Sequence, residues 1–435
     1  MQVRHWEVRT SFSPVTGGFF GIMANMADEK DWDHKKLGRE LDLFTFSDTV
    51  GKGLPLWTPK GTTIRRELER FIVDEEIKRG YQHVYTPDIA NLALYKKSGH
   101  YPYYKKDMYA PIVIDDEQYM LRPMSCPHHF ELYLSRPRSY RELPMRIAEI
   151  AKLYRYEQSG ELMGLLRVRS FCLSDAHIIT QKENTEEEIG KVLDLIDYLT
   201  NVLGLIKDKD YSYQLSLGDR NDEKKYYKDD KAWDMAEEIL RNSLKKRGTK
   251  FVESPGKGAF YGPKIDIQMV NANGKEDTAF TVQYDFVMPK RFGLTYVDND
   301  GQKKEAVVIH RSAIGAIERV IAFLIEHYKG AFPLWLAPVQ IKVLPVSDKS
   351  LAYAKKVASE FLSDNVRVEV DDRPEPLGGK IRDAQLQKIP YMIILGEKEE
   401  KAGTISVRTR EGIDLGQLSI TEFREKVTAL IKKRL

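Results

Sequence analysis

The sequence predicts an α/β protein in two parts: a larger part built on an antiparallel sheet flanked by helices, and a smaller C-terminal α/β unit. Three observations predict this fold class. In the first part, strand-like runs follow one another through hairpin-like turns, with long helices inserted between them. The proline-rich stretch "FPLWLAP" (332–338) then breaks the pattern. After it, strand and helix patterns alternate regularly over about 100 residues.

The first elements can be assigned in order from Asp31. Residues 1–30 have weak periodicity and stay unassigned, and 31–44 is expected to form a short amphipathic helix. A longer helix follows the turn-rich stretch 51–63, where Thr62 or Thr63 could cap it, and it should end at Gly80. Its predicted apolar stripe consists of Ile64, Leu68, Phe71, Ile72 and Ile77.

The remaining elements follow the same two periodicities. A strand is expected over 81–89, ended by Pro87. Further strands are expected at "QYMLRPMS", "RIAEIAKLYRYE", "LRVRSFCLSDAHIIT", "GAFYGPKIDIQMV" and "DTAFTVQYDF", and helices at "KENTEEEIGKVLDLIDYLTNVLG" and "DDKAWDMAEEILRNSLKKRG". Residues 310–328 are expected to form a helix in which Gly315 allows close packing. These assignments give predicted domains of 31–334 and 338–435.

The composition limits the classes of protein that fit. The chain has 435 residues, a net charge of +3 and 31% charged residues, which is typical of a soluble globular protein with local basic faces. Its 2 cysteines cannot form a disulfide framework. No apolar run is long enough for a membrane span, and the N-terminus does not resemble a signal peptide. We therefore expect a cytoplasmic protein that does not insert into a membrane.

The stretch 154–177 carries the clearest chemical pattern. Arg155 and Glu157 are two residues apart, and so are Arg167, Arg169 and Phe171 in turn. On paired strands this spacing puts the side chains on one face. Arginines bind phosphate, a carboxylate accepts from an adenine amine, and a phenyl ring stacks on a base, so the pattern predicts a nucleotide site. An ordinary ladder of surface salt bridges is the alternative that the pattern leaves open.

Two further features are ambiguous by themselves. "LRPMSCPHHFELYL" (121–134) holds Cys126, His128 and His129, which could form a local metal site or supply one ligand to a distant one. A buried cysteine and hydrogen-bonded core histidines are the alternative. Arg319 follows Gly315 and could contact a triphosphate, or it could be an arginine that extends from a core helix to solvent.

Taken together, these motifs resemble the class II aminoacyl-tRNA synthetases. The Arg-x-Glu, loop, Arg-x-Phe pattern resembles motif 2, the Gly-x-x-x-Arg pattern resembles motif 3, and "RGYQHVYTPDI" resembles motif 1. Finer matches are similar to threonyl-tRNA synthetases: "KSGHYPYYKKDMY", "RPMSCP", "SYRELPMRIAE", "GLLRVRSF", "SDAHI", "FYGPKID", "VVIHRSAIGAIERVI" and "DDRPEPLGGKIRDAQLQKIPYMIILGEKE". The likeness runs from about Asp33 to the C-terminus.

The resemblance implies a threonine–tRNA ligase that uses ATP with Mg²⁺. Arg155 would hold the α-phosphate and the threonine carboxylate, and Glu157 would accept from the adenine amine. Phe171 would stack on adenine, Arg167 would meet the γ-phosphate, and Arg319 would bind the triphosphate. Gln283 would also contribute to this pocket.

The resemblance also implies one Zn²⁺, bound by Cys126, His177 and His310, that selects threonine over valine. In this interpretation only Cys126 of the stretch 121–134 is a ligand, and His128 and His129 support the pocket. The threonine pocket would contain Asp175, which accepts from the hydroxyl, Tyr261, which contacts the amine, and Met124.

Partner contacts follow from the same resemblance. His100 would help proton transfer from the ribose hydroxyl of tRNA(Thr). The C-terminal unit would be an anticodon-binding domain in which Glu399 and Arg408 contact anticodon bases. Arg373, Lys380 and Arg382 are candidates for phosphate contacts. Motif 1 around Pro87 would form the interface of a homodimer.

The sequence departs from the family pattern in three places. Leu173 and Thr278 replace glutamines that are common near the substrates. Only about 30 residues precede the predicted core, so we expect no editing of seryl-tRNA in cis. A catalytically impaired paralogue that binds RNA, and a synthetase for serine or proline, are the alternative functions.

Overall fold

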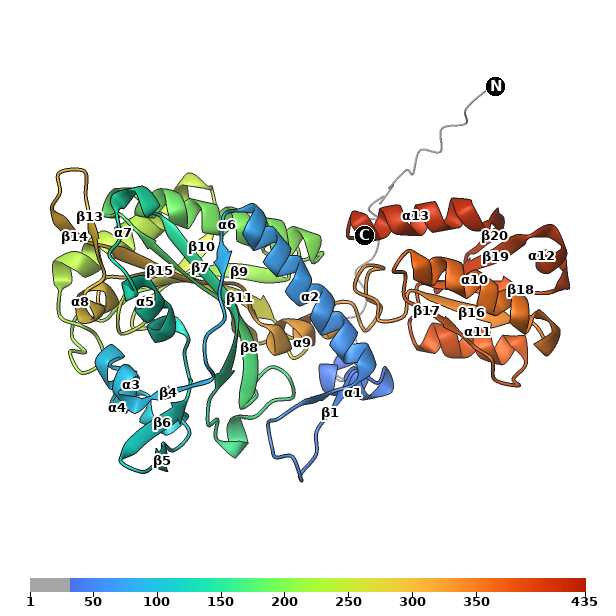
Figure 1. Cartoon of the computed structure of the whole chain (residues 1–435), viewed down its shortest axis with the longest axis horizontal. Coiled ribbons are helices and arrows are strands. Elements are labelled where there is room, and N and C mark those ends of the chain that lie inside the picture. The colour runs from blue at the N-terminus through green and yellow to red at the C-terminus, as the bar shows by residue number, and fades with distance from the viewer. Residues whose placement is uncertain (1–31) are drawn as a thin grey trace, which may run out of the picture.

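An eight-stranded sheet in the order β10-β9-β11-β12-β15-β8-β7-β3 forms the centre of the computed structural model (Figure 1). The structure describes residues 32–435, so the unassigned segment 1–30 lies outside the described residues. Neighbouring strands are antiparallel except at β9/β10 and β3/β7, which confirms the predicted sheet. The strands are β3 (Gln82–His83), β7 (Met145–Tyr154), β8 (Ser170–Thr180), β9 (Tyr211–Ser216), β10 (Phe251–Ser254), β11 (Lys264–Val270), β12 (Glu276–Asp285) and β15 (Val307–Ala316).

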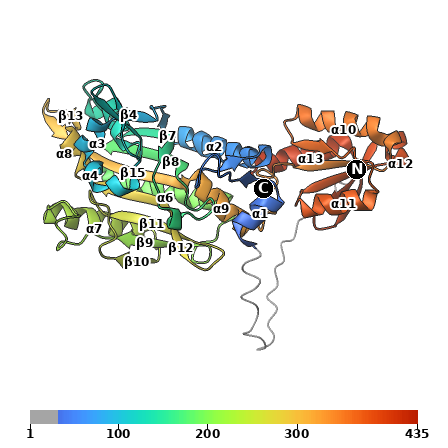
Figure 2. The ribbon, with the colours of Figure 1, turned by 90° about the horizontal axis from the view of Figure 1, so that it is seen from below.

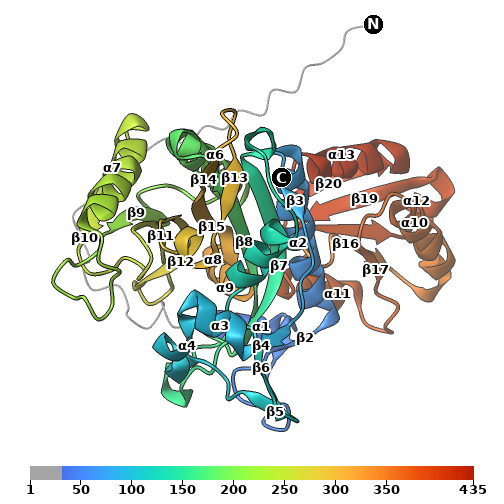
Figure 3. The same ribbon diagram turned by 60° about the vertical axis from the view of Figure 1, so that its left-hand side comes forward.

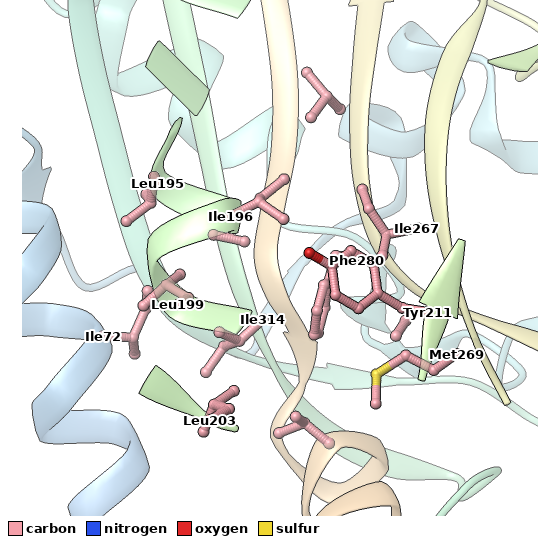
Figure 4. Close-up of a cluster of buried hydrophobic side chains, with 14 of the residues drawn as sticks. Ile72, Leu195, Ile196, Leu199, Leu203, Tyr211, Ile267, Met269, Phe280 and Ile314 are labelled. Carbon is pink, nitrogen blue, oxygen red and sulfur yellow. The ribbon is translucent and has the colours of Figure 1, made fainter. Parts of the chain in front are cut away.

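Amphipathic helices complete the core of this part. α6 (Thr185–Val202) buries Ile196 and Leu199 in the same apolar cluster as Ile267 and Phe280 of the sheet (Figure 4). Burial of this apolar face provides the main driving force for the packing. The other long helices are α2 (Pro59–Lys78), α7 (Asp230–Lys246) and α9 (Ile317–His327). None of the helices in residues 32–435 has both the length and the apolar character that a membrane span requires.

Short elements surround the sheet. The helices are α1 (His34–Glu40), α3 (Leu92–Ser98), α4 (His100–Tyr103), α5 (Cys126–Leu134) and α8 (Met288–Phe292). The strands are β1 (Phe44–Thr45), β2 (Leu56–Trp57), β4 (Ile89–Asn91), β5 (Ile112–Ile114), β6 (Glu117–Leu121), β13 (Thr295–Val297) and β14 (Lys303–Glu305). Within the range 81–89, predicted as one strand, β3 covers only Gln82–His83, because the chain then leaves the large sheet, and Ile89 begins β4 of another sheet.

The helix predicted over 310–328 is wrong in its first part. Residues up to Ala316 belong to β15, and α9 begins at Ile317. A central strand is buried on both faces, so its continuous apolar run resembles a buried helix in sequence. Gly315 has a φ of +69°, and a Cβ there would lie 2.0 Å from the Ala279 carbonyl oxygen, so the predicted close approach is present.

Three other local predictions need correction. The cap of α2 is Thr58, with Pro59 in the first turn, and neither Thr62 nor Thr63 has that role. Ile77 is 56% exposed, so it does not belong to the buried stripe of α2. The hairpin strands also end early: β7 stops at Tyr154 and β8 starts at Ser170, so the charged residues between them lie in a loop.

A second sheet, in the order β17-β16-β18-β19-β20, forms the C-terminal part with its own apolar core. Its elements are β16 (Ile341–Pro345), α10 (Leu351–Ser363), β17 (Val368–Val370), α11 (Leu377–Leu386), β18 (Tyr391–Leu395), α12 (Glu397–Ala402), β19 (Thr404–Thr409), β20 (Asp414–Ser419) and α13 (Ile420–Lys432). α2 extends from the large sheet towards this part (Figure 2). Ion pairs Arg367–Glu67 at 3.4 Å and Arg434–Glu75 at 3.3 Å link the two parts where α13 approaches α2 (Figure 3).

Candidate active site

A cavity of about 220 Å³ opens on the large sheet beside the loop of residues 155–169. All six residues that the resemblance assigns to ATP line this cavity: Arg155, Glu157, Arg167, Phe171, Gln283 and Arg319. They come from the loop, from β8 and β12, and from the first turn of α9. The fold therefore gathers the predicted nucleotide residues at one concave surface, which is where a small-molecule site is expected.

The loop residues of this cavity already contact one another. The Arg155 Cζ lies 5.1 Å from the centre of the Phe171 ring. Nε of Arg167 donates to Oε2 of Glu157 at 2.8 Å. The carboxylate predicted to meet adenine is thus paired with the arginine predicted to meet the γ-phosphate. Nucleotide binding in the predicted pose must exchange this ion pair for contacts with the ligand.

Arg319 is a partly buried cation. Its Nε donates to the Leu166 carbonyl at 3.0 Å and its Nη1 to the Thr278 carbonyl at 2.6 Å. Among the described residues it forms no ion pair with a carboxylate. Burial lowers the pKa of Arg319 and the charge of Arg155 lowers it further, whereas the charge of Asp277 raises it. Because removing a charge from water is costly without a counter-ion, this side chain suits an anionic ligand.

The second feature of the site is a buried cluster of three potential metal ligands. Atoms of Cys126, His177 and His310 that could bind a metal all lie within 4.8 Å of one another. His177 in β8 and His310 in β15 are direct partners in the strand register, and Cys126 is the first residue of α5. Burial raises the pKa of the Cys126 thiol and lowers the pKa of His177. One thiol and two imidazoles are a typical set for zinc with an open fourth position.

Hydrogen bonds behind the cluster fix both imidazole tautomers. Nε2 of His129 lies 3.2 Å from the Glu149 carboxylate, and its Nδ1 lies 2.7 Å from Nδ1 of His177. Since His129 donates to the carboxylate, it accepts from His177, which leaves Nε2 of His177 without a proton. Likewise, Nε2 of His310 lies 2.7 Å from Oδ2 of Asp285, which leaves its Nδ1 without a proton. Both remaining lone pairs are available to a metal.

The cysteine and the two histidines of the stretch 121–134 have different surroundings. His129 contacts His177 and belongs to the supporting shell, as predicted. The ring of His128 instead packs 6.3 Å from that of Tyr95, and neither of its nitrogens has a hydrogen-bond partner among the described residues. The metal-like cluster is therefore assembled across three elements and is not local to this stretch.

The residues predicted to bind threonine connect the cavity to the cluster. The Tyr261 hydroxyl donates to Oε1 of Gln283 at 2.5 Å, and its ring stacks on His310 with centroids 4.9 Å apart. Asp175 accepts a hydrogen bond from the Ser125 hydroxyl, and burial raises its pKa. The Met124 sulfur lies 3.7 Å from Arg155. The cavity and the cluster therefore lie close enough together for one ligand to contact both.

His100 lies beside this region and is fully buried. Its Nδ1 lies 2.7 Å from the Ser98 hydroxyl, and its Nε2 has no partner among the described residues. Burial, followed by the charges of His310 and Arg155, lowers the pKa of His100 to about 3. The imidazole is therefore neutral at physiological pH.

Two positions that depart from the family pattern both line the cavity. Leu173 contributes an apolar side chain to the lining of the cavity. The Thr278 hydroxyl donates to Oε1 of Gln268 at 3.1 Å, while its backbone carbonyl accepts from Arg319. Because Arg319 contacts the backbone carbonyl, this contact does not depend on the side chain at position 278. At position 173, by contrast, an apolar side chain stands in the cavity wall in place of the polar amide of the family pattern.

The predicted tRNA-contacting residues are arranged differently from one another. Glu399 accepts from the Gly396 backbone at 2.9 Å and from the Ser406 hydroxyl at 3.0 Å, so its carboxylate caps α12. Nε of Arg408 is buried without a partner among the described residues. The prediction that Lys380 contacts phosphate is wrong. Lys380 is 4% exposed, and its ammonium group donates to the Pro345 and Asp371 carbonyls.

Sequence reasoning missed the residues that support the cluster from behind. Glu149 and Asp285 are 1% and 0% exposed, and each faces a histidine of the cluster or the partner of one. Although burial raises its pKa, hydrogen bonds from His129 and Thr86 lower the pKa of Glu149 to about 2. The signal available in sequence was an acidic residue inside an apolar strand, which cannot by itself identify its partner.

Comparison with known proteins gives two family matches. Residues 109–328 match the tRNA synthetase class II core domain (G, H, P, S and T), and residues 340–430 match the anticodon binding domain. The chain is 48% identical over 412 residues to a threonine–tRNA ligase of Geobacillus sp. (strain WCH70), covering 94% of this chain and 64% of that protein. It is also 48% identical over 410 residues to a threonine–tRNA ligase of Listeria monocytogenes serotype 4a, covering 93% and 63%.

A solved structure is similar over nearly the whole described fold. The crystal structure of the RNA binding domain of threonyl-tRNA synthetase from Cryptosporidium parvum Iowa II superposes with a TM-score of 0.86 at 35% identity. The match covers 92% of this chain and 98% of that one. Against the curated relatives, by contrast, the chain spans just under two thirds of their length.

Proposed function

The chain belongs to the threonyl-tRNA synthetase family of class II aminoacyl-tRNA synthetases, and on this premise we propose that it activates L-threonine with ATP and transfers it to tRNA(Thr). The observation that carries the proposal is the continuity of the two halves of the site. Gln283 lines the arginine-rich cavity and bonds to Tyr261, which stacks on His310 of the cysteine–histidine cluster. An amino acid at the cluster would present its carboxylate to a nucleotide in the cavity.

Threonine-dependent exchange of pyrophosphate into ATP tests this function, with serine, valine and proline as controls. We expect exchange with threonine, weak exchange with serine and none with valine or proline. Exchange driven by proline or mainly by serine would reassign the substrate. Absence of exchange with retained tRNA binding would support the impaired RNA-binding paralogue, which Leu173 and Thr278 favour.

The proposed chemistry is an in-line attack of the threonine carboxylate on the α-phosphate, with diphosphate leaving. Arg155 would hold the carboxylate and the α-phosphate together, which supplies proximity. Arg319, which forms no ion pair with a carboxylate of residues 32–435, would stabilise the negative charge that develops on the phosphates, together with Mg²⁺ bound to ATP. In the second step the ribose hydroxyl of tRNA attacks the adenylate, and neutral His100 would help move its proton.

We propose that Cys126, His177 and His310 bind one Zn²⁺, since their spacing, burial and fixed tautomers fit that ion. Bound zinc would act as a Lewis acid that engages the amine and hydroxyl of threonine. Asp175, beside the cluster, would accept from the same hydroxyl. Valine lacks this hydroxyl and would leave a buried polar group unpaired, so it would be rejected. Serine retains the hydroxyl and would not be excluded by this site.

Replacing Asp285 with asparagine is expected to weaken zinc binding by about 10- to 100-fold, which is typical of a partner behind a metal ligand. The amide nitrogen would face Nε2 of His310 and shift the proton to Nδ1, while Oδ1 could still accept from Val287 and Met288. Competition with a zinc chelator measures the affinity. Asp266→Asn, a buried carboxylate of β11, is the matched control. Equal zinc affinities for both variants would contradict the assignment.

Leu173→Gln is expected to lower the KM for threonine or ATP by about three- to tenfold, the value of one added hydrogen bond. The new amide would face the wall of the cavity that Arg155 also lines. Pyrophosphate exchange gives both KM values, and Leu173→Met controls for the change of shape. A KM that stays the same or rises for both substrates would count against the prediction.

Contacts with tRNA and with a second subunit remain proposals. We propose that the C-terminal part binds the anticodon through Glu399 and Arg408, and that the core dimerises around Pro87. Exposed apolar side chains support the second proposal, because Tyr85 is 89% exposed and Ile89 is 46% exposed. A monomeric mass by light scattering, unchanged by Tyr85→Lys, would contradict it.

We further propose that neither family-matched region hydrolyses seryl-tRNA, so that these parts charge threonine without editing. Incubation of Ser-tRNA(Thr) with the 435-residue chain tests this. Rapid deacylation above the rate in buffer would overturn the proposal.

A further inference from the structure

His34 joins two functional elements that lie far from it in the sequence. It is the first residue of α1 and is 1% exposed. Its Nδ1 lies 2.6 Å from Oε1 of Glu326, near the end of α9. The backbone N–H of Leu165, in the loop of residues 155–169, donates to its Nε2 at 3.1 Å. The imidazole is therefore a bridge between the nucleotide loop and the helix that carries Arg319.

The geometry requires one tautomer of this imidazole. Nε2 accepts from a backbone N–H, so it must carry a lone pair, and the proton must be on Nδ1, where it is donated to Glu326. Glu326 is held in turn, because its Oε2 accepts from the Ala272 backbone at 2.7 Å. Asp33, 3.6 Å away, and Lys35 are the other charged groups around the ring.

α9 thus holds two adjacent residues of the loop from the same side. Arg319 donates to the Leu166 carbonyl, and Glu326, seven residues later and on the same helix face, holds the Leu165 N–H through His34. Gly164 has a φ of +50°, and a Cβ there would lie 2.1 Å from Nε2 of His34, so the turn fits closely over the ring. The next charged residue of this turn is Arg167, which lines the cavity.

We propose that His34 is a positioning residue that sets the loop of residues 155–169 in the conformation that binds the nucleotide, a role that rests on the proposed ATP-dependent function. Asp33, His34 and Glu326 also lie close enough to suggest a metal site. Both nitrogens of His34 are already used in hydrogen bonds within the protein, so neither is left to bind a metal. His34 therefore acts by holding the loop in place and not by binding a metal.

Two substitutions separate the two hydrogen bonds. Asparagine places its amide near the position of Nδ1 and loses the acceptor for Leu165, whereas glutamine reaches the position of Nε2 with an acceptor oxygen. We expect His34→Asn to weaken binding of a non-hydrolysable ATP analogue by about tenfold or more, since a buried donor loses its partner, and His34→Gln to restore most of it. Calorimetry with the full chain measures the affinity, and His327→Gln, a partly exposed neighbour of Glu326, is the matched control.

If His34→Asn does not fold, Glu326→Gln tests the same bridge. Oε1 of Glu326 accepts from both Nδ1 and the backbone N–H of His34, and Oε2 accepts from Ala272, so a glutamine amide opposes a protein N–H in either orientation. With the amide facing His34, the imidazole proton moves to Nε2, where it opposes the Leu165 N–H. Weaker analogue binding with an unchanged KM for threonine is expected. If both His34→Asn and Glu326→Gln bind the ATP analogue with wild-type affinity, the positioning role of His34 is overturned and the proposed function is unaffected. Failure of the unsubstituted chain to bind the analogue would overturn the proposed function and this inference together.

Discussion

Replacing Cys126 with serine is expected to abolish the proposed zinc binding and to reduce threonine-dependent pyrophosphate exchange by about 10³-fold, because a Lewis acid contributes several kcal/mol of stabilisation. The thiolate is the only sulfur ligand of the cluster, and a serine hydroxyl is a poor ligand for zinc at neutral pH. Burial raises the pKa of this thiol, so zinc binding must release a proton, and zinc affinity should fall as the pH is lowered.

Metal content gives a readout that does not depend on activity. The unsubstituted chain should contain about one zinc per molecule, and Cys126→Ser less than about a tenth of that. Cys172→Ser is the matched control. Cys172 is buried like Cys126, but it lies in β8 and packs in the apolar core, outside the cysteine–histidine cluster. A serine variant that keeps its zinc and the original KM for threonine would contradict the ligand assignment.

The architecture was largely predictable, since both parts follow strong periodic patterns. The exceptions have physical causes. β15 is buried on both faces, so Val307–Ala316 lacks the alternation that marks a half-buried strand. The buried face of α2 continues through Glu75 and Glu76, whereas Ile77 comes five residues after Ile72 and points away from that face. Periodicity reports which residues could be buried, whereas burial depends on what packs against them.

The residues of the candidate site also fall into those that the sequence could identify and those that it could not. Arg155, Glu157 and Phe171 could be predicted because they are close together in the sequence and of types that bind nucleotides. Cys126, His177 and His310 could be grouped only through the resemblance, since strand register pairs the two histidines and the first residue of a separate helix supplies the cysteine. Glu149, Asp285 and His34 escaped both routes. Their importance lies in hydrogen bonds that fix a tautomer, and neither composition nor spacing carries that information.

Arg319→Gln is expected to separate activity from stability. The guanidinium is largely desolvated, has no carboxylate partner among the described residues, and has a pKa lowered by burial. Removing such a charge is usually neutral or stabilising, so the thermal midpoint should stay the same or rise. Without its contact to phosphate, kcat/KM for ATP should fall by about 10²- to 10³-fold.

A glutamine at position 319 retains one N–H donor for the Leu166 or Thr278 carbonyl, which limits the structural change. Arg241→Ala, which removes an exposed arginine paired with Glu253, controls for the loss of one positive charge and should leave exchange unchanged. Pyrophosphate exchange and thermal unfolding of both variants make the comparison. A fall in activity accompanied by an equal loss of folded protein would mean that Arg319 serves the fold. Loss of activity with the thermal midpoint preserved means that the charge of Arg319 is maintained for the nucleotide.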